Sequence, residues 1–335
     1  MSSNPVRVAS LGMGWWSDVL ADAAVRAPEI AIVKCFTRSE EKRNAFAKKY
    51  KCEAVASYEE ILSDGSIQGI INTTPNSVHL ETTRKAAEAG KHVFLDKPIS
   101  NTIADAKAIT RIVKDCRIIL SVGYQRRREN HFKWIRDRIA EGTFGKLVQA
   151  EANISRDREG KFDLTSWRYT AEGMPGGVML QIGVHYVDVL ETILGQVKSV
   201  SGMASQLVLP GDNPDIAGLL MKHKNGAIST LNAGYASASE YYLINIYGKE
   251  MTAYYDVHNG LRTLKRHADE VVPVACEKND TIAEELEEFA ACIRGETEPT
   301  MDGQRATESL AVIRAGITSV KESRTVDVAE ILESE

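Results

Sequence analysis

The chain opens with Val6-Arg7-Val8-Ala9-Ser10-Leu11-Gly12-Met13-Gly14-Trp15-Trp16-Ser17, an apolar run followed by a glycine-rich turn and a helical pattern. Gly12 and Gly14 match the first two glycines of a dinucleotide-binding turn, which brings the backbone close to a pyrophosphate at a helix N-terminus. Ser17 takes the third glycine position, where a small residue still lets helix and strand pack closely. The stretch predicts cofactor contacts from Gly12, Met13, Gly14, Trp15 and Trp16, although a plain strand-to-helix turn fits the same residues.

Strand and helix patterns alternate through the first part of the chain. Apolar runs predict strands at residues 6–11, 31–36, 67–71, 92–95 and 117–122, with helical patterns at 40–50, 77–89 and 104–115 between them. Strands that alternate with helices of this length predict an α/β fold with a doubly wound parallel sheet of the Rossmann type. We expect this NAD(P)-binding domain to span residues 1–123.

Beyond residue 123 the pattern changes. A predicted helix at 129–141 is followed by strand-like runs at 146–154, 197–205, 216–223, 227–236, 243–247 and 251–257, and two more helices are predicted at 281–294 and 306–321. These patterns predict a C-terminal α+β domain, residues 124–335, with a large, mainly antiparallel open sheet for substrate binding and oligomerisation. Asn225-Gly226 predicts a type I′ hairpin turn, which needs a positive φ at both central residues.

Composition narrows the class of protein. The chain has 335 residues, of which 43% are hydrophobic, and a formal net charge of -5, which argues against a nucleic-acid or membrane surface. No apolar run reaches the roughly 18 residues that a membrane span needs. The five cysteines are widely spaced and form no Cys-x-x-Cys pair, so we expect reduced thiols, no metal site and a cytoplasmic protein.

The end of the second predicted strand, Thr37-Arg38-Ser39, indicates the cofactor. NAD-binding domains place an acidic residue near this position to bind the ribose 2′-hydroxyl, and none is present here. A guanidinium beside two hydroxyls suits a 2′-phosphate. The sequence therefore favours NADP(H), with NAD possible if Arg38 is only an exposed loop charge.

Five motifs in the same order resemble the glucose-fructose oxidoreductase, inositol dehydrogenase and MocA (Gfo/Idh/MocA) family of NAD(P)-dependent oxidoreductases. They are the Gly-x-Gly turn, Thr74-Pro75-Asn76-Ser77-Val78-His79, Gly90-Lys91-His92-Val93-Phe94-Leu95-Asp96-Lys97-Pro98, Val122-Gly123-Tyr124-Gln125-Arg126-Arg127 and Gly176-Gly177-Val178-Met179-Leu180-Gln181-Ile182-Gly183-Val184-His185-Tyr186-Val187-Asp188. The resemblance implies hydride transfer between the nicotinamide and a secondary alcohol or ketone of a sugar, polyol or related cyclic diol.

The resemblance also implies roles for single residues. Lys97 matches the family's catalytic lysine, and Asp96 replaces the glutamate that precedes it. His185 matches the histidine that exchanges a proton with the substrate hydroxyl. Gln181 stands where the family has an aspartate, and a neutral amide cannot accept a proton. In a helix over 181–194, Gln181 and His185 fall on one face, so both are expected to address the same ligand.

The remaining implied contacts are to the cofactor. They come from Thr74, Pro75, Asn76, His79 and Gln125, and from Trp167-Arg168, for which a core tryptophan with a surface arginine is the alternative. Arg126, Arg127 and Arg128 fit an acidic substrate or a solvated helix start.

Two rival classes share this pattern: a non-catalytic NADP-sensing regulator and a redox-assisted glycoside-cleaving enzyme with a tightly bound cofactor. Lys97 and His185 together disfavour the regulator, whereas Gln181 leaves the second rival open. We also expect a homodimer or homotetramer, because apolar residues such as Leu219, Met221, Ile228 and Leu231 are predicted to line the open face of the sheet.

Overall fold

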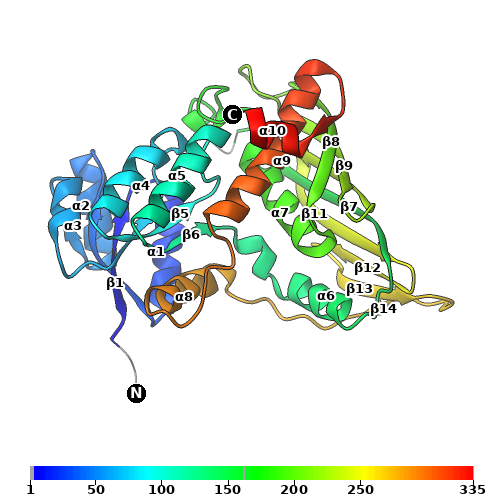
Figure 1. Ribbon diagram of the computed structural model, residues 1–335, viewed down its shortest axis with the longest axis horizontal. Coiled ribbons are helices and arrows are strands. Elements are labelled where there is room, and N and C mark those ends of the chain that lie inside the picture. Colours follow the sequence, from blue (N-terminus) through cyan, green and yellow to red (C-terminus); the bar gives the residue numbers. More distant parts are fainter. Residues whose placement is uncertain (1–3, 161–162, 335) are drawn as a thin grey trace. The chain divides into compact units, whose positions relative to one another are not determined.

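A computed structural model describes residues 4–160 and 163–334 (Figure 1). The chain forms two compact units. The first comprises Met1–Gln125 and Asp280–Thr307, and the second comprises Arg126–Asn279 and Glu308–Glu335.

The first unit contains a parallel sheet. Among the described residues its strands run in the order β3-β2-β1-β4-β5-β6, and every neighbouring pair is parallel. The strands are β1 Val6–Leu11, β2 Ile30–Phe36, β3 Glu53–Ala54, β4 Gly69–Asn72, β5 His92–Asp96 and β6 Leu120–Gly123. The chain winds outward in opposite directions from β1 and β4, so ligands are expected at the carboxyl ends of these two strands. The expected Rossmann fold is confirmed.

Helices of the first unit are α1 Trp15–Arg26, α2 Glu40–Tyr50, α3 Tyr58–Ser63, α4 His79–Glu88 and α5 Ile103–Asp115, with a 3₁₀ turn at Asn76–Val78. Side-chain caps begin several of them. The hydroxyl of Ser39 accepts from the N–H of Lys42 at α2, and that of Thr102 accepts from the N–H of Asp105 at α5. Such caps satisfy N–H groups that the helix itself leaves without partners.

A later helix, α8 (Thr281–Ile293), also belongs to the first unit, where Figure 1 shows it beside α1. Phe289 of α8 packs edge-on against Phe94 of β5, with ring centroids 5.9 Å apart. A Cβ at Gly69 would lie 3.1 Å from the Phe289 ring. The compact units therefore differ from the expected division into 1–123 and 124–335, because the apolar face of α8 completes the core of the parallel sheet.

The second unit contains a larger sheet. Within residues 4–160 and 163–334 its strand order is β14-β13-β12-β11-β7-β10-β9-β8-β15, where β7 and β10 pair in parallel and all other pairs are antiparallel. The strands are β7 Leu147–Asp157, β8 Val197–Ser205, β9 Ile216–His223, β10 Ile228–Gly234, β11 Ala236–Gly248, β12 Met251–Asp256, β13 Gly260–Lys265, β14 Val272–Pro273 and β15 Val326–Asp327. The expected, mainly antiparallel sheet is confirmed.

Helices accompany this sheet. They are α6 Asn130–Ala140, α7 Val184–Leu194, α9 Gly303–Glu322, most of which lies in this unit, and α10 Val328–Ser334. A π-helical turn, Met179–Gly183, precedes α7, and 3₁₀ turns lie at Gln125–Arg128 and Trp167–Tyr169. Helix α7 contacts β7 and β10, so one face of the sheet is covered.

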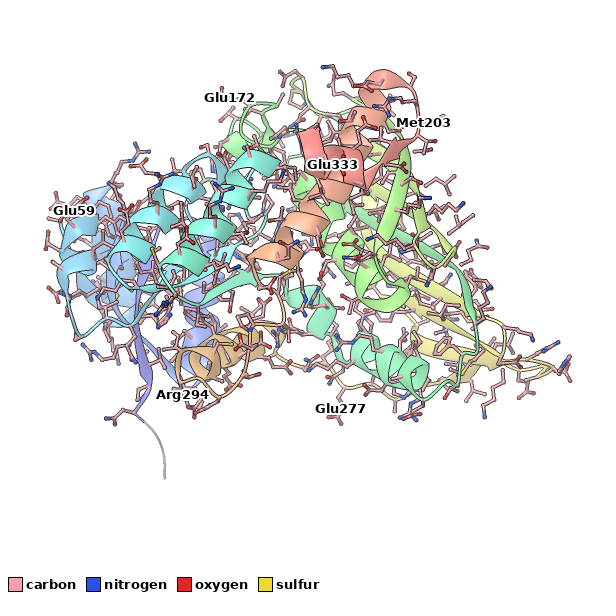
Figure 2. All side chains as sticks on the ribbon, in the orientation of Figure 1. Glu59, Glu172, Met203, Glu277, Arg294 and Glu333 are labelled. Carbon is pink, nitrogen blue, oxygen red and sulfur yellow. The ribbon has the colours of Figure 1, made fainter. Side chains whose placement is uncertain are left out.

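The other face of this sheet carries apolar side chains in the open. Met203, Leu220 and Ile228 are 83%, 50% and 46% exposed (Figure 2 labels Met203). The sequence analysis placed Ile228 correctly on this face but was wrong for three residues, which are buried on the covered side: Leu219, Met221 and Leu231. Successive side chains of a strand alternate between faces, so Ile228 and Leu231, three residues apart on β10, point to opposite faces, and the prediction had grouped residues of both.

The hairpin between β9 and β10 also differs from the prediction. Only Gly226 has a positive φ, 91°. The N–H of His223 donates to the carbonyl of Ala227 at 2.8 Å, and the N–H of Gly226 donates to the carbonyl of His223 at 3.0 Å. This is the three-residue hairpin that ends in a left-handed glycine, in place of type I′. The amide of Asn225 donates to the carbonyl of Leu194 instead, at 2.8 Å.

Candidate active site

The glycine turn lies between β1 and α1. Gly12 has a φ of +87°, and a Cβ there would lie 2.9 Å from the backbone nitrogen of Thr74. Gly14 is the N-cap of α1 without a side-chain cap, and a Cβ there would meet nothing within 4 Å. Ser17 donates to the carbonyl of Gly14 at 2.6 Å. The turn thus leaves open space beside the N–H groups that begin α1, which fits a phosphate.

The side chains around the turn have other partners. Met13 packs against a small core cluster that contains Cys35 and Phe46. Trp16 packs against the main core of the first unit. Trp15 is 56% exposed and meets the Trp16 ring edge-on. Met13 and Trp16 are thus partly buried against the core, and the cofactor contacts predicted for the turn stay predictions.

The β2–α2 turn carries Thr37, Arg38 and Ser39. Arg38 is exposed, while Ser39 is used as the α2 cap. Arg43, which the sequence analysis missed, donates to the carbonyls of Thr37 and Arg38 at 3.5 and 3.4 Å. It also lies 3.7 Å from the Glu40 carboxylate. Its position in the second turn of α2 was the signal that could have found it, since that turn faces the end of β2.

The loop after β4 is held to the glycine turn. The hydroxyl of Thr73 donates to the carbonyl of Gly12 at 2.7 Å, and the N–H of Thr74 donates to the side chain of Asn72 at 3.1 Å. Asn76 is buried and donates to the side chain of Asn101 at 3.0 Å. Pro75 joins these residues in the loop.

His79 connects two loops of the site. Its ring is fully buried, with Nε2 2.9 Å from the Thr74 carbonyl and Nδ1 3.2 Å from the carbonyls of both Pro98 and Ile99. Burial lowers the pKa of His79, which the nearby Asp96 opposes. The ring therefore fixes the Lys97-Pro98 turn to the β4 loop, and the predicted cofactor contact of His79 stays a prediction.

Lys97 follows the last residue of β5, Asp96, which is 7% exposed. The glycine turn, the Thr74 loop and Lys97 thus come from the carboxyl ends of three adjacent strands, β1, β4 and β5. Gln125 follows β6, the next strand of the sheet. The first unit therefore brings most of the predicted cofactor residues to one edge.

In the second unit, Gln181 lies in the turn before α7 and His185 in the first turn of α7. Gly176 and Gly177 precede them with positive φ, and a Cβ at Gly177 would lie 2.4 Å from the carbonyl oxygen of Pro214. Gln181 and His185 are 9% and 6% exposed. Because Gln181 lies in a π turn, the expected one-face α-helical spacing to His185 is interrupted; such turns are frequent at functional sites.

Tyr235, which the sequence analysis missed, donates its hydroxyl proton to the side-chain oxygen of Gln181. Burial raises the pKa of Tyr235 well above its ordinary value, so the hydroxyl remains a donor. Its neighbour Tyr169 meets it edge-on, with ring centroids 5.8 Å apart. A tyrosine near the end of the strand predicted at 227–236 was the available signal.

Two arginines of the run after β6 form ion pairs within the second unit. Arg127 and Asp188 form a two-pronged ion pair, with Nε 2.9 Å from one carboxylate oxygen. Arg126 lies 3.2 Å from Glu129. Burial raises the pKa of Asp188, and Arg127 opposes this. Arg126 and Arg127 thus have carboxylate partners within the chain.

Trp167 and Arg168 form a cation–π pair, with the guanidinium carbon 4.4 Å from the centre of the ring. The predicted contact of this pair with the cofactor stays a prediction.

Among the described residues, no group of three or more His, Cys, Asp or Glu side chains is arranged to hold a metal ion. No helix there is both long and apolar enough to cross a membrane.

Family models match both halves of the chain. Residues 6–124 match the oxidoreductase family with an NAD-binding Rossmann fold, and residues 132–254 match the GFO/IDH/MocA C-terminal domain. D-xylose 1-dehydrogenase [NADP(+)] of Haloarcula marismortui is 25% identical, over 97% of this chain and 94% of its own. The NAD(+)-dependent scyllo-inositol 2-dehydrogenase of Bacillus subtilis is 26% identical, over 80% of each chain.

Among solved structures, one from Desulfitobacterium hafniense, described as an NADPH-dependent oxidoreductase, is similar over 99% of this chain and 100% of its own. The TM-score is 0.93 and the identity 29%. The fold, the glycine turn and both family models agree, and the chain belongs to the Gfo/Idh/MocA family of NAD(P)-dependent dehydrogenases and reductases.

Proposed function

We propose that this enzyme uses NADP(H) to transfer a hydride between the nicotinamide and a secondary alcohol or ketone of a sugar, polyol or related cyclic diol. The observation that carries the proposal is the shared edge of the first sheet, where the glycine turn, the Thr74 loop and Lys97 follow β1, β4 and β5. The names of the xylose and inositol relatives support the substrate class.

The cofactor, when bound, supplies the hydride chemistry, and the protein binds, aligns and handles one proton. In the proposal the Lys97 ammonium donates a hydrogen bond to the reacting oxygen and offsets its developing negative charge. Asp96, at the end of β5, would accept a hydrogen bond from the cofactor ribose.

His185 is proposed to exchange the proton of the substrate hydroxyl with water. Gln181 has no proton to accept or release, so its role is orientation. Tyr235 donates to the Gln181 oxygen, which holds this side chain in one orientation.

NADP(H) preference is proposed from Arg38 and Arg43 at the end of β2. Arg43 donates to the carbonyls of Thr37 and Arg38, which holds the turn in place for Arg38 to meet a 2′-phosphate. No acidic side chain occupies positions 37 to 39, where NAD-selective domains carry one.

The experiment is a turnover screen of sugars, inositols and cyclic diols with each oxidised nicotinamide, followed by nicotinamide absorbance. We expect at least one ring diol or sugar to reduce NADP⁺, with release of NADPH at each turnover. Tight binding of cofactor with no turnover of any member would favour the sensing regulator. Cleavage of a glycoside without net cofactor reduction would favour the redox-assisted hydrolase.

We also propose a cytoplasmic homodimer or homotetramer. The structure describes all five cysteines, and each is a free thiol. The apolar side chains on the open sheet face, including Met203, Leu220 and Ile228, fit pairing of two copies through that face. Light scattering at micromolar concentration should give a multiple of the chain mass, and a monomer would refute the assembly.

A further inference from the structure

Arginines gather at one end of the second sheet, on the face that α7 covers. Side chains alternate along β7, and Ala152 and Ile154 are buried on the covered face, so Arg156 and Arg158 follow them on that face. Arg158 is 6% exposed, and its N–H donates to the carbonyl of Tyr235 at 2.8 Å. Strand register therefore brings two guanidiniums to the end of β10, where Tyr235 binds Gln181.

Tyr169 and Tyr235 share the surroundings of these arginines. Burial raises the pKa of Tyr169, and the guanidiniums of Arg158, Arg168 and Arg156 oppose the rise. The same arginines act in the same direction on the pKa of Tyr235. Arg168, Tyr169 and Tyr235 line one cavity, and Arg156 and Arg158 lie near enough to act on both tyrosines; we call these five residues the arginine pocket.

Arg156 differs from the arginines of the 126–128 run. Arg126 has Glu129 at 3.2 Å and Arg127 has Asp188, but no carboxylate of the described residues lies within ion-pair distance of Arg156. Its Nε is buried and has no hydrogen-bond partner there. Such a group is costly to bury unless an anion joins it.

The residues around Arg156 include further arginines. Its guanidinium carbon lies 5.4 Å from the centre of the Tyr242 ring, which Arg126 also approaches, at 4.6 Å. Burial lowers the pKa of Arg156; Arg126 and Arg158 lower it further, and Tyr242 and Glu240 raise it. The hydroxyl of Tyr242 donates to Glu240 at 2.8 Å, so this carboxylate is already hydrogen-bonded.

We propose that the arginine pocket binds an anionic group of the substrate, a carboxylate or a phosphate, and that the enzyme prefers an acidic or phosphorylated sugar to a neutral one. The inference rests on the proposed function, since it assigns the substrate class of that site. A guanidinium binds either anion through two parallel N–H donors. Tyr169 and Tyr235 add hydroxyl donors, and Gln181, bound to Tyr235, links the pocket to the start of α7.

The test compares matched substrates: glucose, glucuronate and glucose 6-phosphate, with the corresponding members of two other sugar series. We expect kcat/KM for one anionic form to exceed that of the neutral sugar by about 10- to 100-fold, from charged hydrogen bonds. Arg156→Met should remove most of this ratio by raising KM. Arg156→Lys should keep part of it, because the charge remains and the planar fork is lost.

Arg266→Met is the matched control, since Arg266 is a solvent-facing arginine of the same unit that pairs with Glu250. It should leave the ratio unchanged, and melting curves should show that all variants fold. The two anionic sugars distinguish the two possible anionic groups. A preference for glucuronate indicates that the pocket binds a carboxylate, and a preference for glucose 6-phosphate indicates that it binds a phosphate. Equal turnover of neutral and anionic sugars, or an unchanged ratio in Arg156→Met, would overturn the inference and leave the proposed function intact.

Calorimetry on the NADP⁺-loaded protein measures binding of the anionic sugar independently of turnover. If no sugar is turned over but an anionic sugar binds and Arg156→Met abolishes its binding, the proposed function fails and the pocket assignment survives. Absence of anionic-sugar binding overturns the pocket. A loss of NADPH affinity in Arg156→Met equal to the loss of sugar affinity would also overturn it, because the arginines would then hold the cofactor.

Discussion

The first unit is proposed to bind its ligand mainly through backbone groups, at Gly12, Gly14 and the Thr74 loop, whereas the second unit is proposed to use side chains, among them Arg156, Tyr235 and His185. Both units also bury charged side chains, such as Asp96 and Glu285 in the first and Arg158 and Asp188 in the second. Backbone recognition suits a cofactor common to many enzymes, and side-chain recognition suits a substrate that varies between relatives.

The largest expected difference between the units is in kcat, when the proposed catalytic group of each unit is removed. We expect Lys97→Ala to lower kcat about 10³-fold, because a cationic donor to the reacting oxygen is lost. His185→Ala should lower it about 10²-fold, because water can still take the proton. Steady-state kinetics on a substrate from the screen, with cofactor affinity measured by tryptophan fluorescence, checks both. A larger loss in His185→Ala than in Lys97→Ala would assign the main role to the second unit.

The glycine turn allows a sharper test of backbone recognition. Gly12→Ala places a methyl group 2.9 Å from the Thr74 nitrogen at a φ of +87°, so we expect a loss of stability of about 1–3 kcal/mol and weak NADPH binding. Gly14→Ala meets no atom within 4 Å, so its melting temperature should stay unchanged while NADPH affinity falls. Normal NADPH affinity in Gly14→Ala would argue against a phosphate in that space.

Cofactor choice should depend on a side chain even in the first unit. Arg38→Ala should reduce the preference for NADPH over NADH about 10- to 100-fold by removing a charged contact, with NADH affinity unchanged. Lys42→Ala, an exposed cation on α2, is the control and should keep the preference. If the preference survives in Arg38→Ala, the 2′-phosphate is recognised elsewhere.

The buried charge of the second unit predicts a pH effect. Burial raises the pKa of Glu191 to about 7, from an ordinary 4.5, although the N–H of Val197 and the hydroxyl of Ser309 donate to it. The folded protein therefore loses stability as pH rises from about 4.5 to about 7, because ionisation is harder in the folded state than in the unfolded one. Glu191→Gln should stabilise by about 1–3 kcal/mol at pH 8 and by little at pH 4.5. Equal melting shifts at both pH values would contradict the buried-acid account.

The comparison between units also explains what the sequence could predict. Gly12, Gly14 and the alternating strand and helix runs predicted the fold of the first unit, because local backbone conformation restricts which residues can occupy these positions. The same holds for Lys97 at the end of β5. The π turn at Gln181 and the left-handed turn at Gly226 were missed, since the sequence patterns fit the α-helix and the type I′ turn equally well.

Other misses depend on contacts between distant residues. Phe289 assigns α8 to the first unit by packing on Phe94, and no pattern within residues 281–294 indicates that partner. Tyr235 and Arg158 meet only because β10 pairs with β7. The predicted positions of Leu219, Met221 and Leu231 failed because these residues were grouped with Ile228, which alternation puts on the opposite face.

The most direct test of the central proposal is isotope transfer. NADPH carrying deuterium at the transferable C4 position is incubated with the enzyme and the ketone form of a substrate from the screen, and the product is analysed by mass spectrometry. The account predicts one deuterium on the carbon that bears the new hydroxyl, transferred at a rate that Lys97→Ala reduces about 10³-fold. Product without deuterium, or no product while NADPH stays bound, would contradict hydride transfer between this cofactor and a sugar or polyol.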